Sequence, residues 1–345
     1  RVHCFDARNG KTLWSHSYEA PYGGVGYPDG PRASVTVHDG RAYSLGALGH
    51  LYCFDAAKGK VLWSKDLNAA YQIDLPTWGI AAAPLIEGDL VIVQAGGKDA
   101  CLVALDRKTG EERWKGISDP ASYSAPIVIN QAGKRVLVCW TADRVLGLNP
   151  ATGKLYWEAP FPRSRWPIGV ASPVLEGEML FVTSAIDGSL MLRVPSDRLA
   201  VEKVWLRKGP SENRTDALHS LISTPLMVNG YIYGIDISGE LRCLDGKTGD
   251  RIWESLEAVP KNRWAAAHLI RNGDRTWIFN ERGELIIARL TPKGYEEISR
   301  AKLIRPTLGQ LPQRGGVCWA HPAYANRHVF ARNDEELVCA SLAAK

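Results

Sequence analysis

Short runs of alternating apolar and polar residues, separated by glycine-containing turns, follow one another along nearly the whole chain. Between residues 33 and 67 they read ASVTVHD, RAYSLGA, HLYCFDA and VLWSKDL. The turns between them contain Asp39-Gly40, Leu48-Gly49 and Lys58-Gly59. Alternation over a few residues between such turns is typical of antiparallel strands with one buried face. The pattern therefore predicts groups of four short strands.

One ten-residue frame recurs in successive groups. It reads FDARNGKTLW at 5–14, FDAAKGKVLW at 54–63, LDRKTGEERW at 105–114, LNPATGKLYW at 148–157 and LDGKTGDRIW at 244–253. The shared pattern is an apolar residue, Asp or Asn, three residues, Gly, three residues and Trp. A decayed copy ends at Trp205. Four strands repeated in series at a period of about 48 residues are the signature of propeller blades.

The number of blades follows from the strands at the two ends. Six complete groups run from about residue 33 to 303, the N-terminal segment adds VHCFDA and TLWSHSY, and the C-terminal segment adds CWAHPAYAN, HVFARND and ELVCASL. We expect an all-β propeller of four-stranded antiparallel blades, forming a single domain over residues 1–345. Eight blades, the first one incomplete at its N-terminus, are the main expectation, and seven blades are the alternative.

Each part of the frame has a physical role. Asp or Asn opens a tight turn by hydrogen bonding to the backbone two residues on, and Gly supplies the positive φ that ends it. The tryptophan then lies on the outermost strand, where its ring covers the seam to the next blade and its N–H reaches a carbonyl there. The predicted structural docking residues are Trp14, Trp63, Trp114, Trp157, Trp205 and Trp253.

This frame resembles the tryptophan-docking motif of pyrroloquinoline-quinone-like (PQQ-like) propellers, and the resemblance covers nearly the whole chain. The family includes quinoprotein alcohol dehydrogenases, the propeller lipoprotein of the outer-membrane assembly machine, and uncharacterised bacterial repeat proteins. The resemblance implies a periplasmic or secreted bacterial protein. Because the chain begins inside a copy of the frame, we expect the natural N-terminus and any signal peptide to lie outside this sequence.

The dehydrogenases of this family stack their quinone against a vicinal disulfide and hold Ca²⁺ with several oxygen ligands. The seven cysteines here include no adjacent pair, and the loops carry Asp29, Asp74, Asp119 and Asp216 without a repeated carboxylate pairing. We therefore predict no catalytic residue and no cofactor. A divergent alcohol or sugar dehydrogenase that uses PQQ and Ca²⁺ remains the alternative, and a carbohydrate-handling or lyase propeller is a third reading.

The loops before each predicted innermost strand are rich in aromatic residues and arginine. In a propeller these loops gather at one mouth of the central channel, so they form a candidate recognition face. Such a face suits a protein or peptide partner, or an anionic small ligand because of its arginines; plain packing is the alternative. The candidates are Arg32, Trp78, Tyr123, Arg165, Trp166, Arg214, His219, Arg263, Trp264, Arg314, Trp319 and His321.

Histidines from three successive groups, His219, His268 and His321, raise the question of a shared metal ion. His321 lies one residue earlier in its group than His268 does, and adjacent strand positions face opposite ways. We therefore predict no metal site. Four cysteines (Cys4, Cys53, Cys243 and Cys339) recur at one place in the frame, which indicates buried thiols.

Charge and hydropathy exclude other classes of function. The net charge is +5, and Lys and Arg are scattered with no run of five, which argues against nucleic-acid binding. No apolar stretch approaches the ~18 residues of a transmembrane helix. We expect a monomeric, non-enzymatic scaffold that binds its partner through the loop face.

Overall fold

The computed structural model describes residues 1–27, 30–166, 168–309 and 312–343. Over these residues it contains 29 strands, one five-residue α-helix and one 3₁₀ turn. The strands form six four-stranded sheets, one three-stranded sheet and one two-stranded hairpin, and consecutive strands pair antiparallel throughout. The prediction of an all-β propeller with four-stranded antiparallel blades is confirmed. The chain divides into two compact units, Arg1–Pro173 with Val194–Val201, and Val174–Arg193 with Glu202–Lys345.

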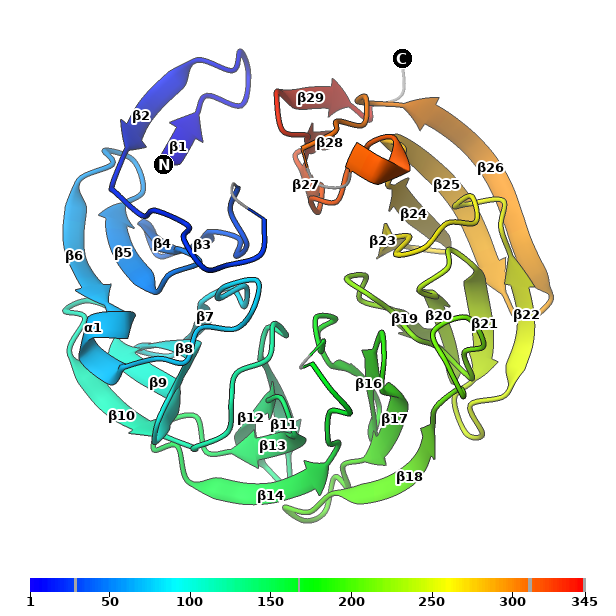
Figure 1. Ribbon diagram of the computed structural model, residues 1–345, viewed down its shortest axis with the longest axis horizontal. Helices are drawn as coiled ribbons and strands as arrows, with labels where there is room; N and C mark the ends of the chain where they lie inside the picture. The colour runs from blue at the N-terminus through cyan, green and yellow to red at the C-terminus, as the bar shows by residue number, and fades with distance from the viewer. Residues whose placement is uncertain (28–29, 167, 310–311, 344–345) are drawn as a thin grey trace. The chain divides into compact units, whose positions relative to one another are not determined.

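The first unit holds the hairpin and three complete blades (Figure 1). The hairpin is β1 (Val2–Phe5) with β2 (Thr12–His16), and the first blade is β3 (Thr36–His38), β4 (Arg41–Leu45), β5 (His50–Asp55) and β6 (Val61–Asp66), followed by α1 (Leu67–Tyr71). The next blades are β7 (Leu85–Glu87), β8 (Leu90–Gly97), β9 (Ala100–Asp106) and β10 (Glu112–Gly116), then β11 (Ile127–Gln131), β12 (Lys134–Trp140), β13 (Arg144–Leu148) and β14 (Leu155–Pro160).

The second unit holds three complete blades and the three-stranded sheet (Figure 1). The blades are β15 (Val174–Glu176), β16 (Met179–Ser184), β17 (Gly188–Arg193) and β18 (Glu202–Arg207); β19 (Leu226–Val228), β20 (Tyr231–Ile235), β21 (Leu241–Asp245) and β22 (Arg251–Ser255); and β23 (Ala267–Asn272), β24 (Arg275–Asn280), β25 (Glu284–Thr291) and β26 (Gly294–Lys302). The 3₁₀ turn η1 (Pro312–Arg314) precedes β27 (Ala323–Ala325), β28 (His328–Arg332) and β29 (Leu337–Ser341).

The expectation of eight blades is wrong, and the seven-bladed alternative matches the structure. Seven of the sheets begin with a short inner strand and continue outward with two or three more strands, which is the arrangement of a blade. In the described residues β1 and β2 pair only with each other, as the equivalents of a third and a fourth strand. The hairpin has no inner strands and does not make a blade of its own.

The turn between the third and fourth strands shows how the repeated frame folds. Between β5 and β6 the Asp55 carboxylate accepts hydrogen bonds from the backbone N–H groups of Ala57 and Lys58. Gly59 follows with φ +68°, and its N–H returns to the Asp55 carbonyl over 2.8 Å. After the turn, Trp63 lies directly opposite Cys53 in the antiparallel pair. The frame thereby fixes the register that places each tryptophan on the outer strand.

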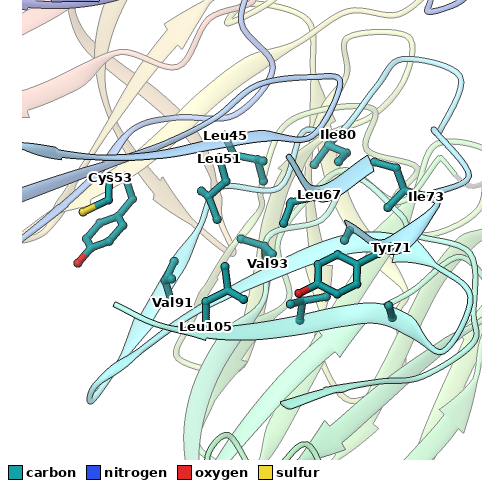
Figure 2. Packing of buried hydrophobic residues seen from close by; sticks show 14 residues of the cluster. Leu45, Leu51, Cys53, Leu67, Tyr71, Ile73, Ile80, Val91, Val93 and Leu105 are labelled. Carbon is teal, nitrogen blue, oxygen red and sulfur yellow. The ribbon is translucent and has the colours of Figure 1, made fainter. Parts of the chain in front are cut away.

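The core lies between the faces of consecutive blades. Figure 2 shows one such cluster, in which Leu45 and Leu51 from the blade β3–β6 pack with Val91 and Leu105 from the blade β7–β10. The helix α1 adds Leu67, which is fully buried. Each such apolar side chain contributes about 1.5–3 kcal/mol through its burial.

Two further observations bear on the class of protein. No helix in the part of the chain that the structure describes is both long and apolar enough to cross a membrane. Five of the seven cysteines are buried: Cys53, Cys101, Cys139, Cys243 and Cys318. Of the four in the repeated frame, Cys4 is half-buried and Cys339 is exposed, so only two of these four fit the expected buried thiols.

Candidate functional site

The six tryptophans of the frame all donate their indole N–H. Five donate to a backbone carbonyl of the following blade: Trp14 to Ala56, Trp63 to Arg107, Trp114 to Pro150, Trp205 to Gly246 and Trp253 to Thr291, over 2.8–3.2 Å. These bonds join five of the outer strands to the blade that follows.

Trp157 differs because the repeat that follows it has decayed. Its N–H donates to the Gln131 side-chain oxygen over 2.7 Å, and the Gln131 amide donates in turn to the Ala200 carbonyl over 2.7 Å. Gln131 therefore links Trp157 to the segment around Ala200, where the Asp–Gly turn of the frame has been lost. The repeated frame gave no signal for this residue, because it lies outside the frame on β11.

In the first unit, the loops before consecutive inner strands contact one another. The Arg32 guanidinium donates to the Trp78 carbonyl over 3.1 Å, the Trp78 N–H donates to the Tyr123 hydroxyl over 3.3 Å, and the Tyr123 N–H donates to the Gly169 carbonyl over 3.0 Å. The rings of Trp78 and Tyr123 also meet edge to face. The loops that carry Arg32, Trp78 and Tyr123 are therefore connected to one another by hydrogen bonds.

Arg32 acts as a clamp within this set. Besides Trp78, its guanidinium donates to the carbonyls of Gly26, Tyr27 and Gly30 over 2.8–3.0 Å. It also lies 5.5 Å from the centroid of the Tyr22 ring. A guanidinium that holds four carbonyls of its own loops is poorly placed to bind an anion.

Arg165 and Trp166 form an exposed pair in the last of these loops. The guanidinium carbon of Arg165 lies 4.1 Å from the centroid of the Trp166 ring. Trp166 is 41% exposed, which is unusual for so large an aromatic side chain. A cation stacked on the indole holds the ring in one orientation while it faces solvent.

A matching pair lies in the second unit, in the loop before β23. The guanidinium carbon of Arg263 lies 4.3 Å from the Trp264 ring centroid. Arg263 also donates two hydrogen bonds, of 2.5 and 3.0 Å, to the carboxylate of Glu212 in the preceding loop. Trp264 is half-buried and has φ +61°, a left-handed conformation that is costly for a bulky residue. The contacts of its neighbours sustain this strained backbone.

Arg314 supplies one of those contacts. It donates to the Trp264 carbonyl over 2.7 Å and to the Glu281 carboxylate over 2.5 Å, and both side chains of this ion pair are buried. Burial raises the pKa of Glu281, and the Arg314 charge opposes that rise. The pair fixes the loop before β27 against the loop before β23.

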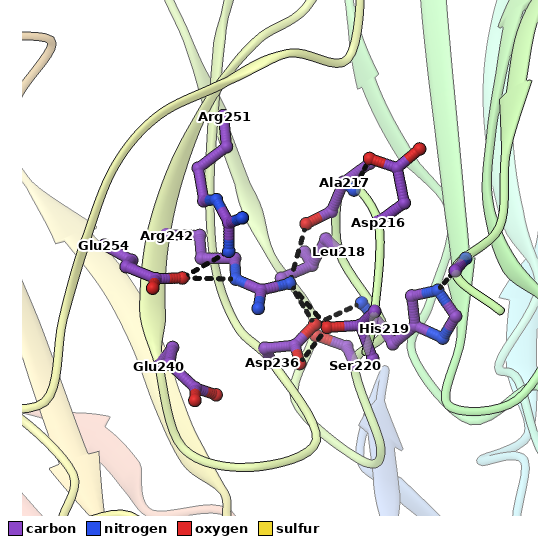
Figure 3. A network of polar contacts seen from close by, with 12 residues as sticks. Asp216, Ala217, Leu218, His219, Ser220, Asp236, Glu240, Arg242, Arg251 and Glu254 are labelled. Carbon is purple, nitrogen blue, oxygen red and sulfur yellow. Dashed lines mark hydrogen bonds and ion pairs between the residues drawn. The ribbon is translucent and has the colours of Figure 1, made fainter. Parts of the chain in front are cut away.

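His219 belongs to a second buried polar network (Figure 3). Its backbone N–H donates to Asp236 over 2.7 Å, and Arg242 donates to the same carboxylate over 2.7 Å. The His219 ring accepts from the Gly209 N–H and contacts the Ala185 carbonyl, and burial lowers its pKa. Burial raises the pKa of Asp236 to about 6 although Arg242 acts in the opposite direction. His219 is thus a neutral packed residue. The sequence frame gave no signal for Asp236 or Arg242.

Arg214 is exposed, and its backbone N–H donates to the Ser211 carbonyl in a short turn. Among the five candidate arginines, Arg32, Arg263 and Arg314 bind groups of the protein itself, which weakens the case for an anionic ligand. The remaining two candidates, Trp319 and His321, lie beside His268. Trp319 presents its carbonyl to His268 Nε2 over 2.9 Å, and the His321 and His268 rings lie with their centroids 3.6 Å apart and their planes tilted by 35°.

Two of the four loop carboxylates, Asp119 and Asp216, are also engaged, whereas Asp74 is exposed. Arg144 and Thr141 donate to Asp119, and Arg207 donates to Asp216 through two bonds of 2.9 Å. Asp29 lies outside the described residues. In the described ranges no group of three His, Cys, Asp or Glu side chains could hold a metal ion. The arrangement presents two arginine–tryptophan pairs, one with an exposed and one with a half-buried indole ring.

Comparison with known proteins decides the family. The model of the family described as outer membrane protein assembly factor BamB matches residues 1–255. The chain belongs to this family. The match crosses the boundary between the two units and includes the five good copies of the tryptophan frame.

The relatives are distant. The outer membrane protein assembly factor BamB of Yersinia pestis is 21% identical over 47% of this chain and 40% of its own length, and that of Shewanella oneidensis is 23% identical over 46% and 39%. The chain thus spans about two fifths of the curated relatives that it matches.

Among solved structures, BamB from Moraxella catarrhalis matches with a TM-score of 0.64, at 17% identity over 96% of this chain and 88% of its own. Quinohemoprotein alcohol dehydrogenase from Comamonas testosteroni matches with a TM-score of 0.65, at 14% identity over 95% and 66%. At these identities the likeness supports the fold alone.

Proposed function

We propose that this BamB-family chain is a non-enzymatic scaffold that binds a protein partner through the loops before its inner strands. The observation that carries the proposal is the recurrence of one arrangement, an arginine stacked on the tryptophan that follows it, in the loops of both units. Tryptophan and arginine are the residues that most often dominate protein interfaces. We further propose that residues 1–345 act as one monomeric propeller domain.

The printed names of the relatives suggest the kind of partner. Both curated relatives are outer membrane protein assembly factors, so we propose a partner in outer-membrane protein assembly and a periplasmic location. The engaged arginines favour a protein or peptide over an anionic small ligand. The dehydrogenase reading has no supporting observation here beyond the shared fold.

The experiment measures binding of unfolded outer-membrane β-barrel proteins, diluted from urea, by fluorescence anisotropy. The double variant Trp166→Ala/Trp264→Ala should weaken binding at least tenfold, because each tryptophan buries a large ring at an interface. The matched control is Leu13→Ala/Leu206→Ala, which removes one exposed apolar side chain from an outer strand of each unit and should leave binding unchanged.

Equal loss of binding in the two double variants, or none in either, would refute the role of the loops. A parallel titration with PQQ and Ca²⁺ addresses the enzymatic reading. One-to-one uptake of the quinone at micromolar or tighter affinity would overturn the non-enzymatic assignment.

A further inference from the structure

One seam between blades lacks the cover that closes four of the others. At those four seams the glycine of the repeated turn packs against the tryptophan ring of the preceding blade. A Cβ added there would lie 2.5–3.2 Å from an atom of that ring, at Gly59 on Trp14, Gly110 on Trp63, Gly153 on Trp114 and Gly249 on Trp205. Each of these glycines comes three residues after the carbonyl that accepts the indole N–H.

The exception is the seam between the blades β19–β22 and β23–β26, both in the second unit. The Trp253 N–H still donates to the Thr291 carbonyl over 2.8 Å, so Gly294 stands at the corresponding position. Apart from its chain neighbours, a Cβ at Gly294 would meet nothing within 4 Å. The sequence explains this, because Leu290 stands where the frame has Asp, and the long turn is lost. Thr291 pairs directly with Gly294 in a tight hairpin instead.

A groove of about 540 Å³ lies at this seam. Residues 253–257 line it from the end of β22, and Gly294 and Tyr295 line it from the start of β26. In the described part of the chain Trp253 makes one ring contact, with Tyr233 of its own blade at a centroid distance of 6.1 Å, and none with Tyr295. The bonded N–H fixes the half-buried indole, which borders the groove without the cover that its counterparts have.

The lining of the groove is acidic. It contains two carboxylate residues, Glu254 and Glu257, and no lysine or arginine. Adjacent positions on a strand face opposite ways, so the Glu254 carboxylate points away from the face that carries Trp253. There it accepts hydrogen bonds from Arg242 and Arg251 (Figure 3). The charge of Glu254 is therefore compensated on the other face of the blade.

The charge of Glu257 is not compensated in this way. Glu257 is exposed, and its carboxylate has no hydrogen-bond or ion-pair partner among the described residues. Its backbone carbonyl accepts from Arg300 over 2.7 Å, but Glu284 and Glu297 already bind that guanidinium. A cation in the groove would gain from the charge of Glu257, whereas an anion would be repelled by it.

We propose that this groove binds a basic side chain of a partner polypeptide, best an arginine. Its planar guanidinium can stack on the Trp253 ring and at the same time donate to the Glu257 carboxylate, with Tyr295 on the opposite side of the groove. That the arginine belongs to the partner bound through the loops rests on the proposed function; the chemistry of the groove does not.

The test follows the indole N–H signal of Trp253 by NMR in the whole chain, assigned by its loss in Trp253→Phe. The probes are the amidated peptide acetyl-Gly-Arg-Gly and the same peptide with citrulline, which has the shape of arginine but no charge. The arginine peptide should shift the signal to saturation and bind about tenfold more tightly, from a cation–π contact and an exposed ion pair together. High salt should reduce this difference.

Equal affinities of the two peptides, or an unmoved Trp253 signal, would overturn the proposal. Saturable binding of maltotriose without binding of the arginine peptide would assign the groove to carbohydrate and would also refute it.

Two variants at exposed residues locate the binding. Glu257→Gln keeps the size of the side chain but removes its charge, and it should weaken binding of the arginine peptide about threefold. Its control is Glu111→Gln, at an exposed carboxylate of the first unit. Leu256→Arg places a guanidinium in the lining at a residue that is 41% exposed, and it should abolish peptide binding. Its control is Leu13→Arg, at a residue of the first unit that is 60% exposed.

Both controls should bind the arginine peptide as the parent does. Binding by Glu257→Gln that equals that of the parent, or peptide binding that survives Leu256→Arg, would place the arginine elsewhere and refute the groove.

The failure of this inference can be told apart from failure of the proposed function. If the arginine peptide does not bind while Trp166→Ala/Trp264→Ala still weakens capture of the partner, the groove proposal alone falls. If the peptide binds but Leu256→Arg leaves partner capture unchanged, the arginine does not come from that partner, and the link between groove and partner is refuted.

Discussion

The indole N–H of Trp114 donates to the Pro150 carbonyl over 2.9 Å and thereby joins two consecutive blades of the first unit. The Trp114 ring is 8% exposed and lies against Gly153 of the same turn. The hydrogen bond and the ring contact act on the same seam. This seam is therefore where the contribution of the repeated frame to stability is best measured.

The variant Trp114→Phe should lower the free energy of unfolding by about 1–2 kcal/mol, because the buried carbonyl of Pro150 loses its donor. Trp114→Ala should lower it by about 3–5 kcal/mol, since a cavity is added. Urea denaturation measures both. Trp166→Phe, at an exposed tryptophan, is the control and should change stability by less than about 0.5 kcal/mol. Equal effects of Trp114→Phe and Trp166→Phe would contradict a structural role for this hydrogen bond.

A glycine on the other side of the same seam allows a matched comparison. Gly153 and Gly133 both have φ +70°, so an alanine is strained at either position. A Cβ at Gly153 would lie 2.6 Å from the Trp114 ring, whereas one at Gly133 would meet nothing within 4 Å. Gly133→Ala should lower the free energy of unfolding by about 1 kcal/mol, because of the strained backbone alone. Gly153→Ala should cost about 1–3 kcal/mol more. Similar melting temperatures of the two variants would show that the Trp114 ring moves aside at no cost in free energy.

The parts of the fold that depend on local sequence could be predicted. The turn at Asp55 and Gly59 is formed by residues within the frame, so each copy specifies its own turn and the strands beside it. The numbers of strands in the N-terminal, middle and C-terminal segments are confirmed for the same reason. The number of blades was predicted wrongly, because it depends on whether a terminal pair of strands acquires inner partners, which no local pattern states.

The candidate site depended on contacts between loops, which the sequence does not encode locally. Arg32 looked like an anion-binding residue, but carbonyls from two loops surround it. His268 and His321 were expected to face opposite ways because of strand alternation. That rule does not apply, since His268 lies on β23 but His321 lies in the coil before β27, and their ring centroids lie 3.6 Å apart. Loop backbones of this kind have no period from which to infer a direction.

The buried ion pair of Arg242 and Asp236 gives a third prediction. Removing the cation alone, with Arg242→Met, leaves a buried carboxylate without its partner and should cost about 3–5 kcal/mol. The double variant Arg242→Met/Asp236→Asn should be more stable than the single variant, because no charge remains to be compensated.

Arg251→Met is the matched control for this cycle. Arg251 contacts the same Glu254 as Arg242 does, but at the surface, so its loss should cost no more than about 1 kcal/mol. Chemical denaturation of the parent, Arg242→Met, Asp236→Asn and the double variant gives the coupling energy between the two side chains. Additive effects of Arg242→Met and Asp236→Asn would show that the pair does not act as a unit.

The last prediction concerns pH. Burial lowers the pKa of His268 to about 3 in the folded chain, against about 6.5 for an ordinary histidine in the unfolded chain. Between these values the unfolded state binds a proton that the folded state does not. The contribution of His268 is therefore fully present above about pH 6.5 and is lost as the pH falls, at up to about 1.4 kcal/mol per pH unit.

His268→Phe removes this contribution, so the free energy of unfolding of the variant should fall less steeply than that of the parent between pH 6.5 and 4.5. Urea denaturation at half-unit steps measures both slopes. Asp236, whose raised pKa of about 6 acts with the opposite sign, and His219 and His321, whose pKa values are lowered like that of His268, are present in both proteins. Their contributions cancel in the difference. Parallel slopes would mean that His268 takes up its proton in the folded chain as readily as in the unfolded one, and would contradict the lowered pKa of this buried ring.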